Sequence, residues 1–417
     1  MYINREIEEY IKESSKSFQA IAIYGARQVG KSTTAKYIFD TFNHVSLDDI
    51  DMLTQAINNP KEFLLANKWP LIIDEVQRAP LLLNEIKLMI DNQRLVWLKN
   101  NEERQLMYVL TGSNQFELQQ GIVESLAGRV AILNMPSLTI SEIEKRKGSL
   151  FNPDINYLIN KVKEKDIKYK NQKQIFNIIF NGSMPDIVAK NSERNLYYKS
   201  YIDTYINRDV SKLISSSSET QFRKFLTYIA LRTSQVVNYE VFGRELGIDS
   251  QTIKRWISIL VTSGIIILLE PYMSNISKRI IKASKLFFLD TGLCSYLCKW
   301  QDSEMLKNGV MSGAFFETFV VSEIIKSFFN HNIDYKNQLY YYRDIDQKEI
   351  DLLYVDNTSI YPIEIKKNMA PIKPDKNFNV LSKFKKEIKP GLIIDNIDQI
   401  KPLNTKTYLF PVSFIGL

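Results

Sequence analysis

The stretch GARQVGKST, residues 25–33, has the residue types and the spacing of a phosphate-binding loop. It fits the pattern G-x-x-x-x-G-K-[ST], follows the apolar run AIAIY and precedes the helix-like run STTAKYIFD. Backbone N–H groups of such a loop, together with the first turn of the following helix, favour a bound anion. The pattern therefore predicts a nucleotide-binding loop in which Lys31 contacts the β- and γ-phosphates and Ser32 binds Mg²⁺. The predicted nucleotide-binding residues are Gly25, Ala26, Arg27, Gln28, Val29, Gly30, Lys31, Ser32 and Thr33.

Further apolar runs end in polar residues that would complete this site. PLIIDEV ends near Asp74 and Glu75; an acid at a strand tip beside such a loop holds Mg²⁺, and a following Glu can polarise the attacking water. LMYVLTGSNQF ends near Ser113 and Asn114, which could contact the γ-phosphate or that water. Arg129 either stabilises transition-state charge on a neighbouring subunit or is a surface arginine. Hydrolysis is favoured over phosphoryl transfer because no acceptor-binding motif is evident.

A second group of charged residues interrupts strand-like runs near the C-terminus. Asp351 lies in KEIDLLYV, whereas Glu364 and Lys366 lie in YPIEIKKN, two residues apart and so on one face of a strand. The intervening DNTS predicts a hairpin that brings Asp351 alongside Glu364. Glu317 lies upstream in the amphipathic helix predicted for SGAFFETFVVSEIIKSF.

An acid on a helix, an acid on a strand and then E-x-K is the pattern of metal-dependent PD-(D/E)XK nucleases, which use a lysine beside the metal-bound water. Glu317, Asp351 and Glu364 are thus predicted metal ligands, and Lys366 is a predicted catalytic residue. The alternative is a half-exposed sheet in which Glu and Lys form pairs.

The order of apolar and amphipathic stretches along the chain predicts an α/β protein of four parts, which must position these residues. In 1–145, apolar runs alternate with amphipathic stretches, which predicts a P-loop NTPase domain with a parallel sheet. Residues 146–235 are predicted to form a helical linker and lid-like region, and 236–300 a winged-helix segment. Residues 301–417 are predicted to form a small α/β, restriction-endonuclease-like domain.

Residues 238–270 have the spacing of a helix-turn-helix followed by a strand, with Lys254 and Arg255 exposed on the second helix. The run SNISKRIIKASKLFFLD is predicted to form a wing. Contact with the DNA backbone, with little base specificity, is the functional interpretation. The alternative is a protein–protein or interdomain module. The basic residues of the predicted wing are Lys278, Arg279, Lys282 and Lys285.

These motifs together resemble the prokaryotic AAA-type ATPases that carry a C-terminal domain of unknown function numbered 4143. The resemblance is carried by YGARQVGKST, LIIDEVQRAP, LTGSNQF, SLAGRV, NGSMP, YIDTYINRDV and FLDTGL, within residues 21–295. It implies an ATP-binding P-loop domain, a winged helix and a module resembling the PD-(D/E)XK nucleases. NGSMP has serine where a second glycine is common, which we expect to affect a loop and not the chemistry.

Composition sets wider limits. The 417 residues are 45% hydrophobic and 24% charged, as in soluble globular proteins of several domains. Since no apolar run is long enough to span a bilayer and the N-terminus has no signal-peptide core, we expect a cytoplasmic protein without a membrane partner. The net charge of +7 leans toward an anionic partner. Cys294 and Cys298 are predicted to be reduced core residues, and only His44 and His331 are available for imidazole chemistry.

Two hypotheses of function follow. The first is an ATP-hydrolysing protein, with ATP and Mg²⁺ as cofactors, that acts on DNA through a winged helix and a metal-dependent nuclease-like domain. The alternative is a switch or scaffold ATPase whose winged helix and inactive nuclease-like domain mediate protein contacts. ATPases of this class often form rings, which is compatible with a homo-oligomer, but the sequence does not define the oligomeric state.

Overall fold

The computed structural model of the chain describes residues 2–113, 125–164, 167–190, 192–206, 210, 213–214, 218–273, 283–368 and 373–416. Its N-terminal part is built on a parallel five-stranded sheet in the order β2-β3-β4-β1-β5. The predicted parallel α/β sheet is confirmed. The strands are β1 (Ala20–Tyr24), β2 (Asn43–Ser46), β3 (Leu71–Asp74), β4 (Tyr108–Gly112) and β5 (Val130–Asn134).

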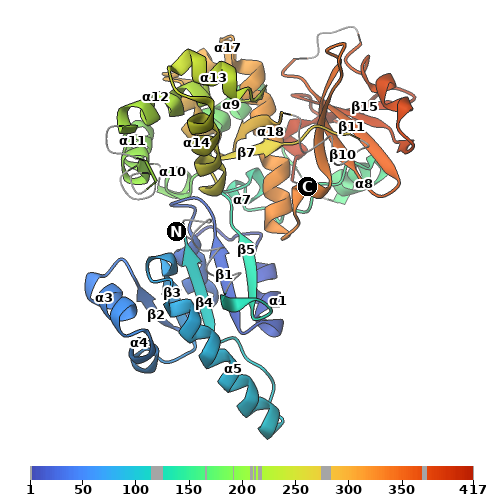
Figure 1. Ribbon diagram of the computed structural model, residues 1–417. Coiled ribbons are helices and arrows are strands. Elements are labelled where there is room, and N and C mark those ends of the chain that lie inside the picture. The colour runs from blue at the N-terminus through green and yellow to red at the C-terminus, as the bar shows by residue number, and fades with distance from the viewer. Residues whose placement is uncertain are drawn as a thin grey trace.

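Helices cover both faces of this sheet, because its central strands are apolar on both sides. Ile21 and Ile23 of β1 face a core that includes α1 and α2, and Ala20 and Ala22 face one that includes α4 and α5. Figure 1 shows α5 projecting away from the rest of the chain. The helices are α1 (Glu8–Ser17), α2 (Lys31–Ile38), α3 (Ile50–Asn58), α4 (Pro60–Ala66), the 3₁₀ turn η1 (Val76–Arg78) and α5 (Leu82–Asn100).

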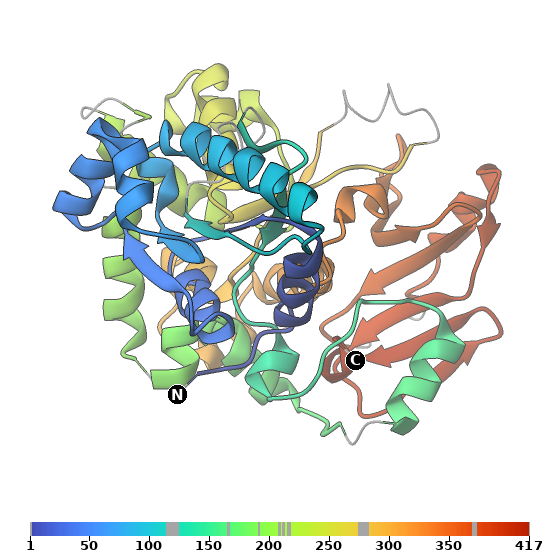
Figure 2. The same ribbon diagram turned by 90° about the horizontal axis from the view of Figure 1, so that it is seen from below.

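The chain after β5 is helical. Asn171 begins α9 as a capping box, because its side chain accepts from the Gln174 N–H while the Gln174 side chain accepts from the Asn171 N–H. Figure 2 shows α8 beside the C-terminal sheet, although the two are far apart in sequence. The helices are α7 (Ile140–Ile143), α8 (Ile155–Glu164), α9 (Gln172–Asn181), α10 (Pro185–Lys190), α11 (Arg194–Tyr205) and α12 (Glu219–Ala230).

A helix-turn-helix comes next, and a three-stranded antiparallel sheet of order β6-β8-β7 packs beside it. The first helix ends at Gly247, whose φ of 67° suits glycine, and Asp249 caps the second by accepting from the Thr252 N–H. Residues 274–282, which belong to the predicted wing, lie outside the described part of the chain, so the winged helix stays a prediction. The elements are β6 (Gln235–Val236), α13 (Tyr239–Leu246), α14 (Ser250–Thr262), β7 (Ile266–Leu269) and β8 (Lys285–Phe288).

The C-terminal domain packs the long helix α18 (Ser312–Asn330) against a mixed sheet of order β14-β15-β13-β11-β10-β9, with β12 paired to β11 (Figure 1). Among the described residues, no helix is long and apolar enough to cross a membrane. The helices α16 (Thr291–Leu297) and α17 (Ser303–Asn308) and the turn η4 (Tyr335–Asn337) flank α18. The strands and remaining turns are β9 (Leu339–Arg343), β10 (Glu349–Val355), β11 (Ser359–Ile365), η5 (Phe378–Lys383), β12 (Glu387–Ile388), β13 (Gly391–Asp395), β14 (Lys401–Asn404), β15 (Thr407–Pro411) and η6 (Val412–Phe414).

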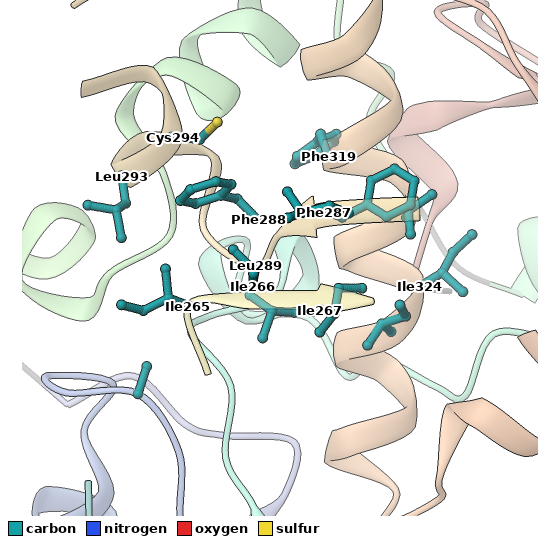
Figure 3. Packing of buried hydrophobic residues seen from close by; sticks show 14 of the residues in the cluster. Ile265, Ile266, Ile267, Phe287, Phe288, Leu289, Leu293, Cys294, Phe319 and Ile324 are labelled. Carbon is teal, nitrogen blue, oxygen red and sulfur yellow. The ribbon is translucent and has the colours of Figure 1, made fainter. Parts of the chain in front are cut away.

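One cluster of buried apolar side chains runs through the helical region, the helix-turn-helix and the C-terminal domain. Figure 3 shows Phe287 of β8 and Ile267 of β7 close to α18, which contributes Phe319 and Ile324 to the same cluster. The helix-turn-helix module, here residues 233–273 and 283–290, is therefore fixed to α18 by a shared core. The free Cys294, predicted to be a core residue, is buried in it.

A buried ion pair on α18 connects this core to the N-terminal sheet. Lys326 donates to Glu323 at 2.9 Å, to the Leu138 carbonyl at 3.0 Å and to the Ser183 hydroxyl at 2.9 Å. The other oxygen of Glu323 accepts from the Ile140 N–H at 2.7 Å. Leu138 and Ile140 follow β5, so α18 is bound directly to the segment that leaves the N-terminal sheet.

The serine that departs from the resemblance pattern, Ser183, takes part in this network. Its hydroxyl lies 3.0 Å from Ser137 and 3.1 Å from Asp290, and its N–H donates to Asp290 at 2.8 Å. Tyr198 donates to the other oxygen of Asp290 at 2.8 Å. Residues of two quoted motifs, Ser183 of NGSMP and Asp290 of FLDTGL, thus meet at one structural junction.

Glu6 lies beside the same junction among other acids. It accepts from Asn330 at 3.0 Å and Thr139 at 2.9 Å, and burial followed by the charge of Glu142 raises the pKa of Glu6 to about 7. A carboxyl group whose pKa is higher in the folded chain favours folding most while it is protonated. Its contribution is complete below pH 4.5 and is lost as the pH rises to about 7.

We therefore expect Glu6→Gln to become more stable relative to the wild type as the pH rises from 4.5 to 7, by about 1.4 kcal/mol for each unit of pKa shift. Thermal unfolding of both proteins at pH 5 and pH 8 measures this difference. Glu13→Gln, on an exposed residue of α1, is the control and should show no such trend. A Glu6→Gln difference that is the same at both pH values would contradict the buried, proton-binding state of Glu6.

Candidate functional site

The phosphate-binding loop leaves β1 through two glycines that no other residue can replace without strain. Gly25 has a φ of 151°, and a Cβ there would lie 2.1 Å from the Met135 carbonyl oxygen. Gly30 has a φ of 97° and is the N-cap of α2. The loop is thereby pressed against the end of β5, with its last residues at the positive end of α2.

Lys31 and Ser32 lie where the sequence predicts them. The Lys31 ammonium donates to the carbonyls of Gly25 at 3.0 Å and Ala26 at 2.8 Å, so it lies inside the loop. The Ser32 hydroxyl donates to Asp74 at 2.7 Å. Thr111 at the end of β4 also donates to Asp74. The carboxyl ends of β1, β3 and β4 therefore bring the loop and the predicted Mg²⁺ ligands together, and Thr111 is a member that sequence reasoning missed.

Glu75 has a left-handed backbone, with a φ of 57°, directly after β3. Its carboxylate accepts from Gln77 at 2.5 Å and from Ser113 at 3.1 Å. These two donors hold the carboxylate beside the end of β4. Asn114, which was predicted for the same place, lies outside the described residues.

A cleft of about 600 Å³ opens over the loop. It lies between the P-loop and α10, and Glu75 reaches its wall. Tyr2 from the N-terminal segment also lines it and stacks on Tyr37, with 3.9 Å between ring centroids. The cleft joins the P-loop, the predicted catalytic Glu75 and the helical region in one site.

Arg5 is a further member of this site that sequence reasoning did not identify. Its buried guanidinium donates to the Val29 carbonyl of the loop at 2.8 Å, to the Pro136 carbonyl at 2.7 Å and to Glu142 at 3.0 Å. The loop is thus held from the N-terminal segment. A lone arginine in an amphipathic stretch gives no sequence signal of such contacts.

The structure does not bring Arg129 to the P-loop of its own chain. Arg129 precedes β5, whose first residue pairs with Ala20, whereas the P-loop follows Tyr24 at the opposite edge. Its guanidinium donates twice to Asp91, at 2.7 Å and 2.9 Å. A role on a neighbouring subunit stays a prediction.

The C-terminal acids come together as the hairpin prediction requires. β10 pairs with β11 so that Leu352 lies opposite Ile363, which sets Asp351 beside Glu364. Lys366 lies 2.6 Å from Glu364 and 3.6 Å from Asp351. Asp351 also accepts from the Ile365 N–H at 2.8 Å.

The prediction that Lys285 projects from a basic wing is wrong. Lys285 begins β8 and is only 3% exposed, because β8 is the middle strand between β6 and β7. Its ammonium lies 2.6 Å from Glu317, 2.7 Å from Glu349 and 4.0 Å from Asp351. The predicted acid on α18 is therefore present in the cluster, but it is paired with a lysine from the helix-turn-helix module. The other predicted wing residues, Lys278, Arg279 and Lys282, lie outside the described residues.

The acid cluster, here Glu317, Glu349, Asp351 and Glu364, does not fit a metal ion in this arrangement. Among the described residues, no group of three or more His, Cys, Asp or Glu side chains is placed to hold one. Lys285 and Lys366 divide the predicted ligands between them. Burial raises the pKa of Glu317 to about 7, although the charge of Lys285 acts to lower that pKa. For Glu364, burial and then the charge of Asp351 raise the pKa to about 8.

Models of known families match both the N-terminal and the C-terminal part of the chain. Residues 17–144 match the family model described as AAA domain, and residues 312–415 match the Domain of unknown function (DUF4143). The chain therefore carries an AAA domain in its N-terminal part and a DUF4143 domain at its C-terminus. Between them, residues 172–304 match the Domain of unknown function (DUF8612).

Relatives of this AAA-type protein include Uncharacterized protein Rv2008c of Mycobacterium tuberculosis and Uncharacterized protein Mb2031c of Mycobacterium bovis. Each is 23% identical over 353 residues, which is 84% of this chain and 71% of the relative. Among solved structures, the Walker-type ATPase PABY2304 of Pyrococcus abyssi is similar with a TM-score of 0.43 and 14% identity, over 71% of this chain and 96% of that one. The ORC2 protein of Aeropyrum pernix is similar with a TM-score of 0.35 and 10% identity, over 77% and 92% of the two chains.

The contacts of Arg5 predict that Arg5→Met destabilises the AAA domain strongly. Removing one partner of a buried ion pair leaves the other charge uncompensated and costs about 3–5 kcal/mol. Arg129→Met is the matched control, because the Arg129–Asp91 pair is partly exposed and is worth about 0–1 kcal/mol. Thermal unfolding of both variants tests this, and equal losses of stability would contradict the role of Arg5 as a buried support of the loop.

Proposed function

We propose that the AAA domain binds ATP with Mg²⁺ and hydrolyses it to ADP and phosphate. The observation that carries this proposal is the Ser32–Asp74 hydrogen bond of 2.7 Å beside the Lys31 ammonium inside the loop. The arrangement of these three side chains supports the binding of a nucleotide phosphate and its cation. The cleft of about 600 Å³ over the loop supplies the space.

Each residue has a defined part in this reaction. The loop N–H groups and the Lys31 ammonium would bind the β- and γ-phosphate oxygens, after Lys31 leaves the carbonyls of Gly25 and Ala26. Ser32 and Asp74 would hold Mg²⁺, which neutralises phosphate charge when bound. Glu75, oriented by Gln77 and Ser113, would accept a proton from the water that attacks the γ-phosphorus as the bond to the β-phosphate oxygen breaks.

We expect two substitutions to separate binding from hydrolysis. Lys31→Ala should lose ATP binding, because the cation that faces the phosphates is removed. Glu75→Gln should keep binding and lower kcat by about 10²-fold or more, because the amide cannot accept the proton. Phosphate release and binding of a fluorescent ATP analogue measure the two effects, with unfolding temperatures as the control for folding. Retained hydrolysis in Lys31→Ala would contradict the proposed site.

We further propose that the exposed face of α14 contacts the DNA backbone. The helix buries Ile253, Trp256 and Ile257 against the core and leaves Lys254 and Arg255 exposed. That charge pattern, on the second helix of a helix-turn-helix, supports contact with phosphates. The opposite side of the helix-turn-helix module packs on α18 through β8. This packing supports the alternative role, an interdomain contact, for that side. One module can serve both purposes because the two faces are different.

The double variant Lys254→Ala/Arg255→Ala should bind duplex DNA more weakly, and its binding should depend less on salt. Each lost phosphate contact makes the negative slope of log K against log salt concentration shallower by about 0.9. Fluorescence anisotropy of a labelled duplex over a range of NaCl concentrations measures this slope. Lys12→Ala/Lys16→Ala, on exposed residues of α1, is the matched control for the loss of two charges. Equal slopes for the wild type and the α14 variant would contradict the proposed DNA face.

A further inference from the structure

The ammonium of Lys285 lies among three carboxylates of the acid cluster, and two of them, Glu317 and Asp351, are predicted metal ligands. We propose that the Lys285 ammonium takes the place of a metal ion in the acid cluster. It prevents metal binding there while the helix-turn-helix module is packed against α18. The inference concerns an interdomain contact and is independent of ATP hydrolysis and of the DNA face of α14.

The geometry excludes a cation at the same point. The Lys285 nitrogen is 2.6 Å from Glu317 and 2.7 Å from Glu349, with Asp351 at 4.0 Å. Mg²⁺ needs oxygens at about 2.0–2.1 Å in octahedral geometry, so it cannot enter while the ammonium stays between these carboxylates. On the other side of the cluster, Lys366 contacts Glu364 at 2.6 Å.

The strand that carries Lys285 is fixed beside the acid cluster. This strand is held on one side by β7, where Lys285 pairs with Leu269, and on the other by β6, where it pairs with Val236. Further along the same strand, Phe287 and Phe288 are completely buried and lie in the core near α18 (Figure 3). The backbone of Lys285 is therefore fixed beside the cluster, and it can be displaced only if the module moves.

The same module supplies a second and a third contact to α18. Ser234 donates to the other oxygen of Glu317 at 2.5 Å, so both oxygens of that carboxylate are taken by the module. Next to it, the hydroxyls of Thr233 and Thr318 are 2.8 Å apart. The contact is thus a built interface across α18 and not a single accidental ion pair.

The cluster keeps capacity for a cation once Lys285 is removed. One oxygen of the buried Glu364 has no hydrogen-bond partner among the described residues. Lys285→Met would leave Glu317 without its ammonium, while Glu349 would keep only Arg343 at 3.8 Å and Asp351 only Lys366 at 3.6 Å. Because uncompensated buried carboxylates are unfavourable, a divalent cation should enter the variant and restore part of its lost stability.

The test counts Mn²⁺ ions bound to the nucleotide-free full chain by electron paramagnetic resonance. Wild type and Asp351→Asn are expected to bind the same number, because Lys285 already excludes the ion. Lys285→Met is expected to gain one Mn²⁺ per chain and to unfold at a higher temperature when Mn²⁺ is present, and Lys285→Met/Asp351→Asn should lose both effects. Lys326→Met, which removes another buried and ion-paired lysine, is the matched control and should gain no ion.

Two results would overturn the proposal. One is a bound Mn²⁺ in the wild type that disappears in Asp351→Asn, since the acids would then hold metal despite Lys285. The other is a folded Lys285→Met that gains no ion. If Lys285→Met does not fold, the comparison of wild type with Asp351→Asn still decides: equal Mn²⁺ binding supports the proposal, and loss in Asp351→Asn overturns it.

Discussion

Helix α18 is the constraint on which the rest of the structure depends, because it is buried over most of its length by three different parts of the chain. The Glu323–Lys326 pair of α18 binds the segment after β5. Phe319 and Ile324 share a core with β7 and β8. Within the C-terminal domain, α18 packs against the strands β10 and β11. A polar pair is stable in this interior because every charged oxygen and the ammonium have partners.

This arrangement connects the nucleotide cleft to the C-terminal domain by continuous contacts. The P-loop glycine Gly25 lies against Met135, and the chain from Met135 runs through Ser137 and Leu138 to Lys326. Arg5 touches both the loop and this segment. A change in the loop on binding the proposed ATP would therefore act on residues that directly contact α18. The same helix carries Glu317, whose carboxylate is shared with Lys285.

The features that sequence reasoning predicted correctly are local ones. The order of apolar strand, Gly-rich turn and helix predicts the P-loop, and strand tips of one parallel sheet meet at one edge, so Asp74 had to lie beside Ser32. The pairing of Asp351 with Glu364 follows in the same way from a short hairpin. Arg129 is the instructive exception: it precedes its strand, so the same rule places it at the opposite edge.

The features that were missed depend on packing between distant segments. Lys285 looks like one more residue of a basic run, and its burial follows only from the place of β8 between two strands and against α18. Glu349 looks like a charge that marks the start of a strand, until Lys285 is brought to it. Arg5 and Glu142 are 137 residues apart, and no local pattern predicts their ion pair.

The central claim, that the loop, Ser32 and Asp74 form one nucleotide and cation site, is tested most directly by calorimetric titration of the full chain with ATP, with and without Mg²⁺. The account predicts one ATP per chain, bound more tightly with Mg²⁺, and a loss of that Mg²⁺ dependence in Ser32→Ala. Absence of ATP binding, or binding whose strength is the same with and without Mg²⁺ in the wild type, would contradict it.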